Sequence, residues 1–147
     1  MKRIRRSAIV EHRAAELYAL VEDIEAYPKF LPWCLSASVR ERGAGRTLAT
    51  LRVGVKGIDT SFSTENRNVA GEAISMRLVD GPFKRFAADW RFRALSEKAA
   101  KIEFSMEYEF SNRVTGKALE PLFEHIADTM VEAFMRRAEA VYGKAAD

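Results

Sequence analysis

The sequence predicts an α+β fold, in which helices cover one face of a curved sheet of seven antiparallel strands. Near both ends of the chain, apolar residues recur every three or four positions, which is the period of a helix. Between these ends they alternate with polar residues over about eighty positions, interrupted by glycine-containing turns. Strands with one polar and one apolar face are typical of antiparallel sheets that carry their helices on one side.

The first predicted elements are a short strand and a helix. The strand is expected over about residues 3–10. The next apolar residues are three or four positions apart, at Leu17, Leu20, Val21 and Ile24. This spacing predicts a helix over about residues 13–23, with one further helical turn up to Tyr27.

The segment 27–34, with the sequence YPKFLPWC, concentrates aromatic residues and prolines, and we call it the hook. Pro28 and Pro32 each remove a backbone donor and fix φ. The chain should therefore leave the helix at about Pro28 and continue as a rigid, largely non-helical turn that carries Phe30 and Trp33. A rigid turn between helix and sheet is expected where the two meet.

About six strands are expected after the hook, and five of them have assignable bounds. They are residues 49–55, 58–65, 74–78, 86–94 and 102–110, with turns at 43–45, 54–57, 71 and 81–82. In the last two strands the alternation is strict, so apolar residues share one face and charged residues the other.

A long helix is expected over about residues 117–142. Its apolar residues form one stripe, at Leu119, Leu122, Phe123, Ile126, Met130, Val131, Phe134, Ala138 and Val141. Because proline cannot sit unperturbed inside a helix, the helix should begin near Ala118 or bend at Pro121. Gly143 is a natural stop.

One helix cannot fill the concave side of so curved a sheet, so a cavity of roughly 300–1,000 Å³ is expected between them. Its expected lining is Phe62, Met76, Phe86, Trp90, Phe92, Phe104, Met106 and Tyr108 from the sheet, Phe123, Met130 and Phe134 from the helix, and Tyr27, Phe30 and Trp33 from the hook at the rim. Plain core packing is the alternative. Adaptable methionines, and the polar residues Thr60, Thr64 and Asn66 on the same face, favour a cavity.

Composition and length place the chain among ordinary globular proteins. It has 147 residues, 48% apolar and 31% charged, and one domain over residues 1–147 is expected. The single cysteine, Cys34, fits a reducing compartment and a place in the core. Too few apolar residues follow the basic N-terminus for a signal peptide, so a cytoplasmic location is expected. A net charge of +3 permits an anionic partner without requiring one.

Motifs for catalysis and metal binding are absent from the sequence. It contains two histidines, His12 and His125, but no HExxH motif, Gly-rich phosphate loop or cysteine pair. The acid–base candidates among the inward-facing residues are Tyr108 and Asn66. We therefore expect a binding protein without metal or covalent cofactor, and an aromatase or cyclase is the least favoured alternative.

Five segments together carry a family resemblance. They are VEDIEAYPKFLPWC (21–34), VGVKG (53–57), LVDGPFK (78–84), WRF (90–92) and YEF (108–110). In this order they resemble the bacterial coenzyme Q-binding START-domain family, which is also labelled ribosome association toxin RatA and polyketide cyclase/dehydrase. The resemblance implies a helix-grip fold of the SRPBCC superfamily, with a hydrophobic tunnel, a ligand such as ubiquinone or another polyisoprenoid lipid, and a carrier role that supports respiration.

Two positions depart from the pattern that the resemblance implies. Val55 stands where phenylalanine is common, which would reshape the pocket that it is expected to line. Arg13 stands where serine or threonine often caps the first helix, so His12, Glu11 or water is expected to supply the cap.

Exchange of a lipid ligand with a membrane would need a gate. The hook and the turn that ends in Phe83 are the expected gate, and Lys29 and Lys84 are expected to touch anionic headgroups. Phe83 therefore joins the predicted ligand-binding residues. The protein would then lie transiently at the periphery of the inner membrane.

Ribosome binding is the competing prediction, suggested by the family's second label. Arg85, Arg91 and Arg93 on one outer face, and the basic tract 2–6, could contact phosphates. Glutamates on the same face dilute the positive potential, and solvated strand charges are the ordinary explanation. The alternative to the carrier is thus a toxin-like protein that binds the large ribosomal subunit and blocks subunit association, with no DNA partner.

Overall fold

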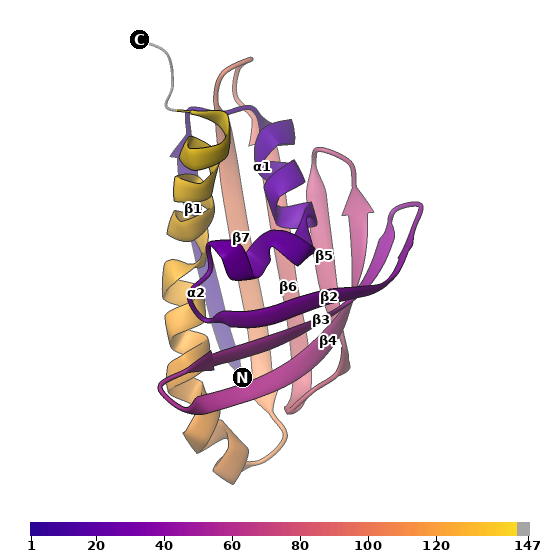
Figure 1. Ribbon diagram of the computed structural model, residues 1–147, viewed down its shortest axis with the longest axis vertical. Coiled ribbons are helices and arrows are strands. Elements are labelled where there is room, and N and C mark those ends of the chain that lie inside the picture. Colours follow the sequence, from indigo (N-terminus) through magenta and orange to yellow (C-terminus); the bar gives the residue numbers. More distant parts are fainter. Residues whose placement is uncertain (144–147) are drawn as a thin grey trace.

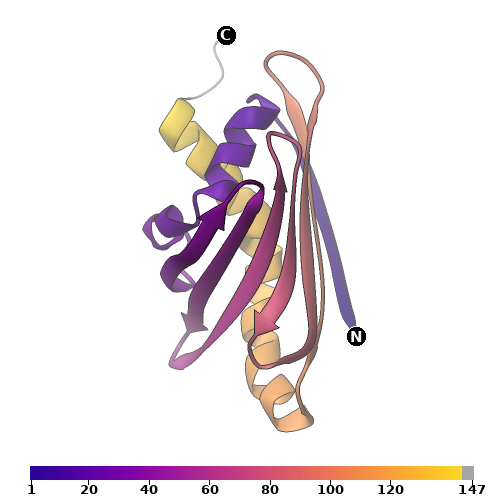
Figure 2. The same cartoon turned by 90° about the vertical axis from the view of Figure 1, so that its right-hand side faces the viewer.

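A seven-stranded sheet curls around one long helix in the computed structural model of the protein, which describes residues 1–143 (Figure 1, Figure 2). The elements are β1 (Lys2–Val10), α1 (Ala14–Glu22), η1 (Ile24–Lys29), β2 (Cys34–Gly43), β3 (Arg46–Val55), β4 (Ile58–Val69), β5 (Ala73–Asp80), β6 (Phe83–Ala94), β7 (Ala100–Phe110) and α2 (Arg113–Tyr142). The predicted α+β fold is confirmed. Residues 144–147, included in the expected domain, lie outside the described residues.

The sheet has the order β1-β7-β6-β5-β4-β3-β2, and all neighbouring strands are antiparallel. Strands β2 to β7 follow one another as hairpins, and β1 adds to the free edge of β7. Between Ser63 and Thr64 of β4 the register shifts, because β5 carries one extra residue there, Val79, and such irregularities increase the local twist. In Figure 1, β2, β3 and β4 run obliquely to the steeper β5–β7, and in Figure 2 α2 lies between these two groups.

Helix α2 begins four residues before the predicted Lys117, at Arg113. Asn112 caps it, because its Oδ1 accepts a hydrogen bond from the backbone N–H of Thr115 at 2.9 Å. The apolar stripe did not reveal this first turn, because its one large apolar residue, Val114, is 81% exposed and does not face the core. Pro121 therefore lies inside the helix, on its exposed side, rather than near its start.

The segment between β1 and β2 also differs from the prediction. Neither His12 nor Glu11 caps helix α1: the Glu16 carboxylate reaches back and accepts from the Arg13 backbone N–H at 2.9 Å. The hook is partly helical, because the 3₁₀ helix η1 continues through Pro28 to Lys29. Proline is tolerated in this helix because a short 3₁₀ helix contains few backbone N–H···O=C hydrogen bonds that proline could remove.

Strand β2, for which the sequence suggested no bounds, forms the second edge of the sheet. Its apolar residues are few, and Leu35 is 46% exposed, so alternation is weak. Edge strands need bury only part of one face, which explains the missing signal.

Candidate functional site

A cavity of about 50 Å³ lies between the concave face of the sheet and α2. It is lined by Ile24, Tyr27, Trp33, Ala49, Leu51, Val53, Phe62, Thr64, Asn66, Met76, Phe86, Ala88, Trp90, Phe104, Met106, Phe123, Ile126 and Met130. The expected volume of several hundred Å³ is wrong: this space would hold a few water molecules at most. Aromatic rings close it, as where Trp90 meets Phe104 with ring centroids 4.8 Å apart.

Ten of the predicted ligand-binding residues surround this cavity. They are Tyr27, Trp33, Phe62, Met76, Phe86, Trp90, Phe104, Met106, Phe123 and Met130. Both Tyr27 and Trp33 come from the hook, so the hook borders the cavity at the meeting point of helix and sheet. Whether these side chains bind a ligand stays a prediction.

Two predicted residues belong instead to an aromatic cluster that adjoins the cavity. Phe83 packs against Phe110 at 5.3 Å and against Phe123 at 5.0 Å between ring centroids, and Tyr108 lies 5.8 Å from Phe123. This cluster fills the space between β6, β7 and the N-terminal part of α2. Neither residue lines the cavity, and Phe123 belongs both to this cluster and to the lining.

The other four exceptions lie away from the cavity lining, and two of them, Phe92 and Phe134, are buried in the core. Phe92 packs edge-on under Tyr18 of α1, with ring centroids 5.8 Å apart. Phe30 covers Phe134 at 5.2 Å, and neither ring reaches the cavity. Val55 lies at the end of β3, beside the turn to β4, and is only half-buried. Alternation identifies the face of a residue but not its position along the strand.

Eight lining residues were absent from the prediction, and most are small or aliphatic. They are Ile24, Ala49, Leu51, Val53, Thr64, Asn66, Ala88 and Ile126. The inward phase of Thr64 and Asn66 was the available signal. Both are buried, and the Thr64 hydroxyl donates to Oδ1 of Asn66 at 2.7 Å. This bond satisfies part of the polarity that an apolar cavity would otherwise penalise.

Acid–base chemistry in the cavity finds little support. Among the described residues that line it, none carries a carboxylate, imidazole, amine or guanidinium group. The Tyr27 hydroxyl donates to the backbone carbonyl of Val21, and burial raises its pKa. Tyr108, expected to project inward, lies outside the cavity, and burial raises its pKa as well. Asn66 cannot transfer a proton at neutral pH.

Cys34 lies buried at the start of β2, as its lone occurrence suggested. Burial raises the pKa of its thiol to about 11, so the thiolate is scarce at neutral pH. The residue therefore fills space and is not an activated nucleophile.

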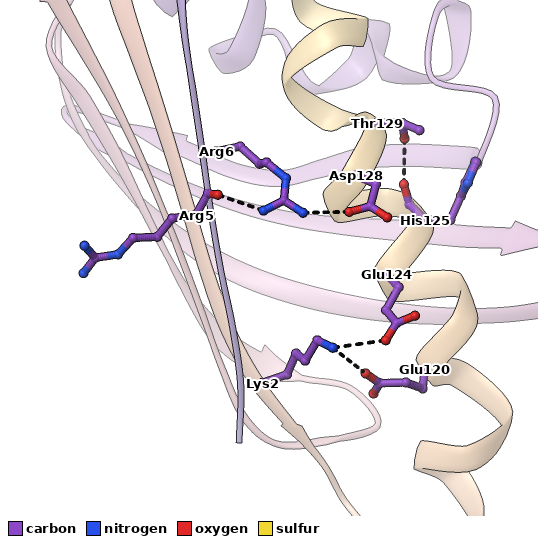
Figure 3. Close-up of polar contacts among 8 residues, drawn as sticks. All are labelled: Lys2, Arg5, Arg6, Glu120, Glu124, His125, Asp128 and Thr129. Carbon is purple, nitrogen blue, oxygen red and sulfur yellow. Dashed lines mark hydrogen bonds and ion pairs between the residues drawn. The ribbon is translucent and has the colours of Figure 1, made fainter.

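The basic tract 2–6, which was predicted to contribute phosphate contacts, is divided between the two sides of β1 (Figure 3). Lys2 donates to Glu124 at 3.1 Å and Arg6 to Asp128 at 2.8 Å, so both are engaged by α2. Arg5 points to the opposite side of the strand.

The convex side of the sheet carries a hollow of about 660 Å³ across β1, β5, β6 and β7. Arg77 pairs there with Asp89 at 3.3 Å and Arg93 with Glu103 at 3.6 Å. Within residues 1–143, Arg5 and Arg91 have no ion pair. Serines 7, 75 and 105 lie among them, so the hollow offers guanidinium and hydroxyl donors to an anion. We call it the arginine hollow.

A seven-stranded antiparallel sheet that grips a C-terminal helix over an apolar interior defines the helix-grip class of START-type proteins. The chain belongs to the polyketide cyclase/dehydrase and lipid transport family, whose model matches residues 10–135. The family resemblance predicted from the sequence is thereby confirmed. No helix within residues 1–143 is both long and apolar enough to cross a membrane.

Several curated proteins are similar to the chain over nearly its whole length. The ribosome association toxin RatA of Vibrio cholerae serotype O1 is 40% identical over 144 residues, covering 98% of this chain and 100% of the relative. The persistence and stress-resistance toxin PasT of Escherichia coli O6:H1 is 39% identical, covering 97% and 90%. The mitochondrial coenzyme Q-binding protein COQ10 homolog B of Xenopus laevis is 26% identical, covering 94% and 58%.

Solved structures with the same fold have low sequence identity. The Zhui aromatase/cyclase from Streptomyces sp. R1128 has a TM-score of 0.84 at 16% identity, covering 94% of this chain and 93% of that one. A START superfamily protein from Mycobacterium smegmatis has a TM-score of 0.80 at 19% identity, covering 95% and 98%. At these identities the likeness supports the fold alone.

Proposed function

We propose that the protein binds the large ribosomal subunit and blocks subunit association, without enzymatic activity. The observation that carries this proposal is the similarity, at 39–40% identity over nearly the whole chain, to proteins named ribosome association toxins. The sequence alone favours quinone binding over ribosome binding. The relatives and the small cavity support the opposite order, and association with ribosomes would place the protein in the cytoplasm.

The arginine hollow is the proposed contact surface. Arginine is the side chain best suited to phosphate oxygens, because its planar guanidinium donates two parallel hydrogen bonds. Arg5 and Arg91 are free to do so, since neither is engaged in an ion pair within residues 1–143. Of the described residues that line the hollow, one is aromatic, Phe104, and it is buried, so they offer no exposed ring to stack on a base. The contact would therefore read the phosphate backbone.

Sedimentation with purified large subunits tests this proposal. We expect co-sedimentation at low salt that weakens steeply as KCl rises, because phosphate contacts release counterions. The double variant Arg5→Glu with Arg91→Glu should bind at least about tenfold more weakly. Arg40→Glu with Arg113→Glu makes the same change in net charge at exposed positions away from the hollow, and it should bind within about twofold of wild type.

Two results would contradict the proposal. Equal loss of binding in both double variants would mean that only net charge matters, and the arginine hollow would not be the surface. Absence of co-sedimentation at any salt concentration would remove ribosome binding itself.

Quinone or lipid binding is the second candidate. The family description, the distant coenzyme Q-binding relative and the apolar lining of the cavity favour it. Met76, Met106 and Met130 could adjust their rotamers, but a polyisoprenoid would have to open a space far larger than 50 Å³. Organic extraction of protein purified without detergent, followed by mass spectrometry, tests this candidate. An extract free of quinone and lipid would count against it.

A further inference from the structure

A second concave site lies outside the cavity, between the hook and the C-terminal half of α2. This outer groove has a volume of about 480 Å³, within the range of small-molecule sites and far above that of the cavity. Its apolar surface comes from Phe30, Pro32 and Trp33 of the hook and from Ala133 and Ala140 of α2. The function proposed above makes no use of it.

Hydrogen bonds hold the groove in place. Trp33 Nε1 donates to Thr129 Oγ1 at 3.2 Å, and that hydroxyl donates to the His125 carbonyl at 2.8 Å. The indole of Trp33 is therefore fixed to α2, and it forms a wall shared by the groove and the cavity. A surface fixed before binding loses little entropy when a ligand arrives.

The charges around the groove leave one cation uncompensated. Arg136 pairs with Glu132 at 2.5 Å. Arg137 stacks over the Phe30 ring, with Cζ 4.9 Å from the centroid, and it has no ion pair within the described part of the chain. Its Nε is buried without a hydrogen-bond partner. A guanidinium that is held on an apolar surface without an ion-pair partner is poised for an anion.

We propose that the outer groove binds a single-chain amphiphile with a carboxylate head. The carboxylate would pair with Arg137, and the hydrocarbon chain would lie along Phe30, Pro32 and Trp33. The charge selects a singly charged head, because Glu132 already neutralises Arg136 and only one positive charge remains. This site is independent of ribosome binding.

Titration calorimetry with dodecanoate, below its micellar concentration, tests the proposal. Arg137→Gln keeps much of the side chain but removes the charge, and it should weaken binding about tenfold, whereas Arg137→Lys, which keeps the charge but not the stacked guanidinium, should restore part of the affinity. Arg113→Gln, in the first turn of the same helix, should bind like wild type. Dodecyltrimethylammonium, with the opposite charge, should bind much more weakly than dodecanoate.

A second pair of variants distinguishes the groove from the cavity. Ala133→Phe places a ring in the groove and should abolish dodecanoate binding, whereas Ala49→Val fills the cavity and should leave it unchanged. The reverse pattern would overturn the proposal in favour of the cavity. Equal affinity of wild type and Arg137→Gln, or no binding of dodecanoate by wild type, would overturn it as well. Thermal unfolding of each variant shows whether it is folded.

Discussion

Trp90 of β6 and Phe134 of α2 meet edge to face, with ring centroids 5.3 Å apart and ring planes at 75°. Trp90 is 2% exposed and Phe134 fully buried, so this contact joins the concave face of the sheet to the C-terminal half of the helix that it grips. Edge-to-face pairs add to the stabilisation that burial of each ring provides. Trp90 also lines the cavity, whereas Phe134 does not.

We expect Trp90→Ala to lower the free energy of unfolding by about 3–5 kcal/mol, because the lost ring leaves a large void in packed surroundings. Urea denaturation followed by circular dichroism measures this. Val114→Ala, at an exposed apolar position, should change stability by no more than about 0.5 kcal/mol. A loss for Trp90→Ala well below the expected range would mean that the indole borders a larger space than the structure shows.

The turn between β5 and β6 packs closely on the cavity wall at Gly81. A Cβ placed there would lie 2.6 Å from the Cβ of Phe62, and the φ of 153° is one that other residues rarely adopt. We expect Gly81→Ala to destabilise the protein by about 1–3 kcal/mol. Gly43→Ala, where a Cβ would meet nothing within 4 Å, is the matched control and should be nearly neutral. Equal midpoints of thermal unfolding for the two variants would contradict this.

Cys34 should be protected from alkylation in the folded protein. With its pKa raised to about 11 from an ordinary 9.0, the thiol has about a hundredfold less thiolate at pH 8. Burial slows the reagent further. Iodoacetamide labelling followed by mass spectrometry should therefore be slow in buffer and rapid in urea. Fast labelling of the folded protein would show that the hook opens readily.

Strict alternation allowed β6 and β7 to be predicted to within a few residues, because charged residues such as Arg91 and Glu103 mark the solvated face throughout. The start of α2 could not be predicted from apolar spacing, since its first turn carries no buried apolar side chain. Asn112, a favoured cap residue, was the available signal there. A cap residue marks the end of a helix through its own hydrogen bond to the backbone, whereas apolar periodicity marks only the turns that bury a side chain.

The errors in predicting the cavity lining and the partners of the charged residues have a common physical reason. Trp90 and Phe92 share one face of β6, yet only Trp90 reaches the cavity, because Phe92 lies farther along the strand under α1. Likewise Arg5 and Arg6 are neighbours in a basic tract, but the helix that pairs with Arg6 is more than a hundred residues away in sequence. Periodicity assigns faces, whereas partners depend on the tertiary arrangement.

The contact between β1 and α2 should make the free energy of unfolding depend on pH through Glu120. Burial raises the pKa of the Glu120 carboxyl, against the opposing effect of Lys2, whose ammonium lies 3.8 Å away. Because the pKa in the folded state exceeds the ordinary 4.5, the folded protein binds this proton more tightly than the unfolded chain does. The stabilisation linked to this proton is full below about pH 4.5 and is lost as pH rises through the folded pKa.

Glu120→Gln removes this ionisation, so the variant should be more stable than wild type at pH 7 and similar to it at pH 4. The gain should stay under about 1 kcal/mol, because the side chain is partly exposed and solvent screens its charge. Urea midpoints of both proteins from pH 4 to pH 8 measure the difference. Glu97→Gln, in the exposed turn between β6 and β7, serves as the control and should show no such trend. A Glu120→Gln variant that instead becomes less stable than wild type as pH rises from 4 to 8 would mean that the ion pair with Lys2, and not the burial of the carboxylate, dominates at this position.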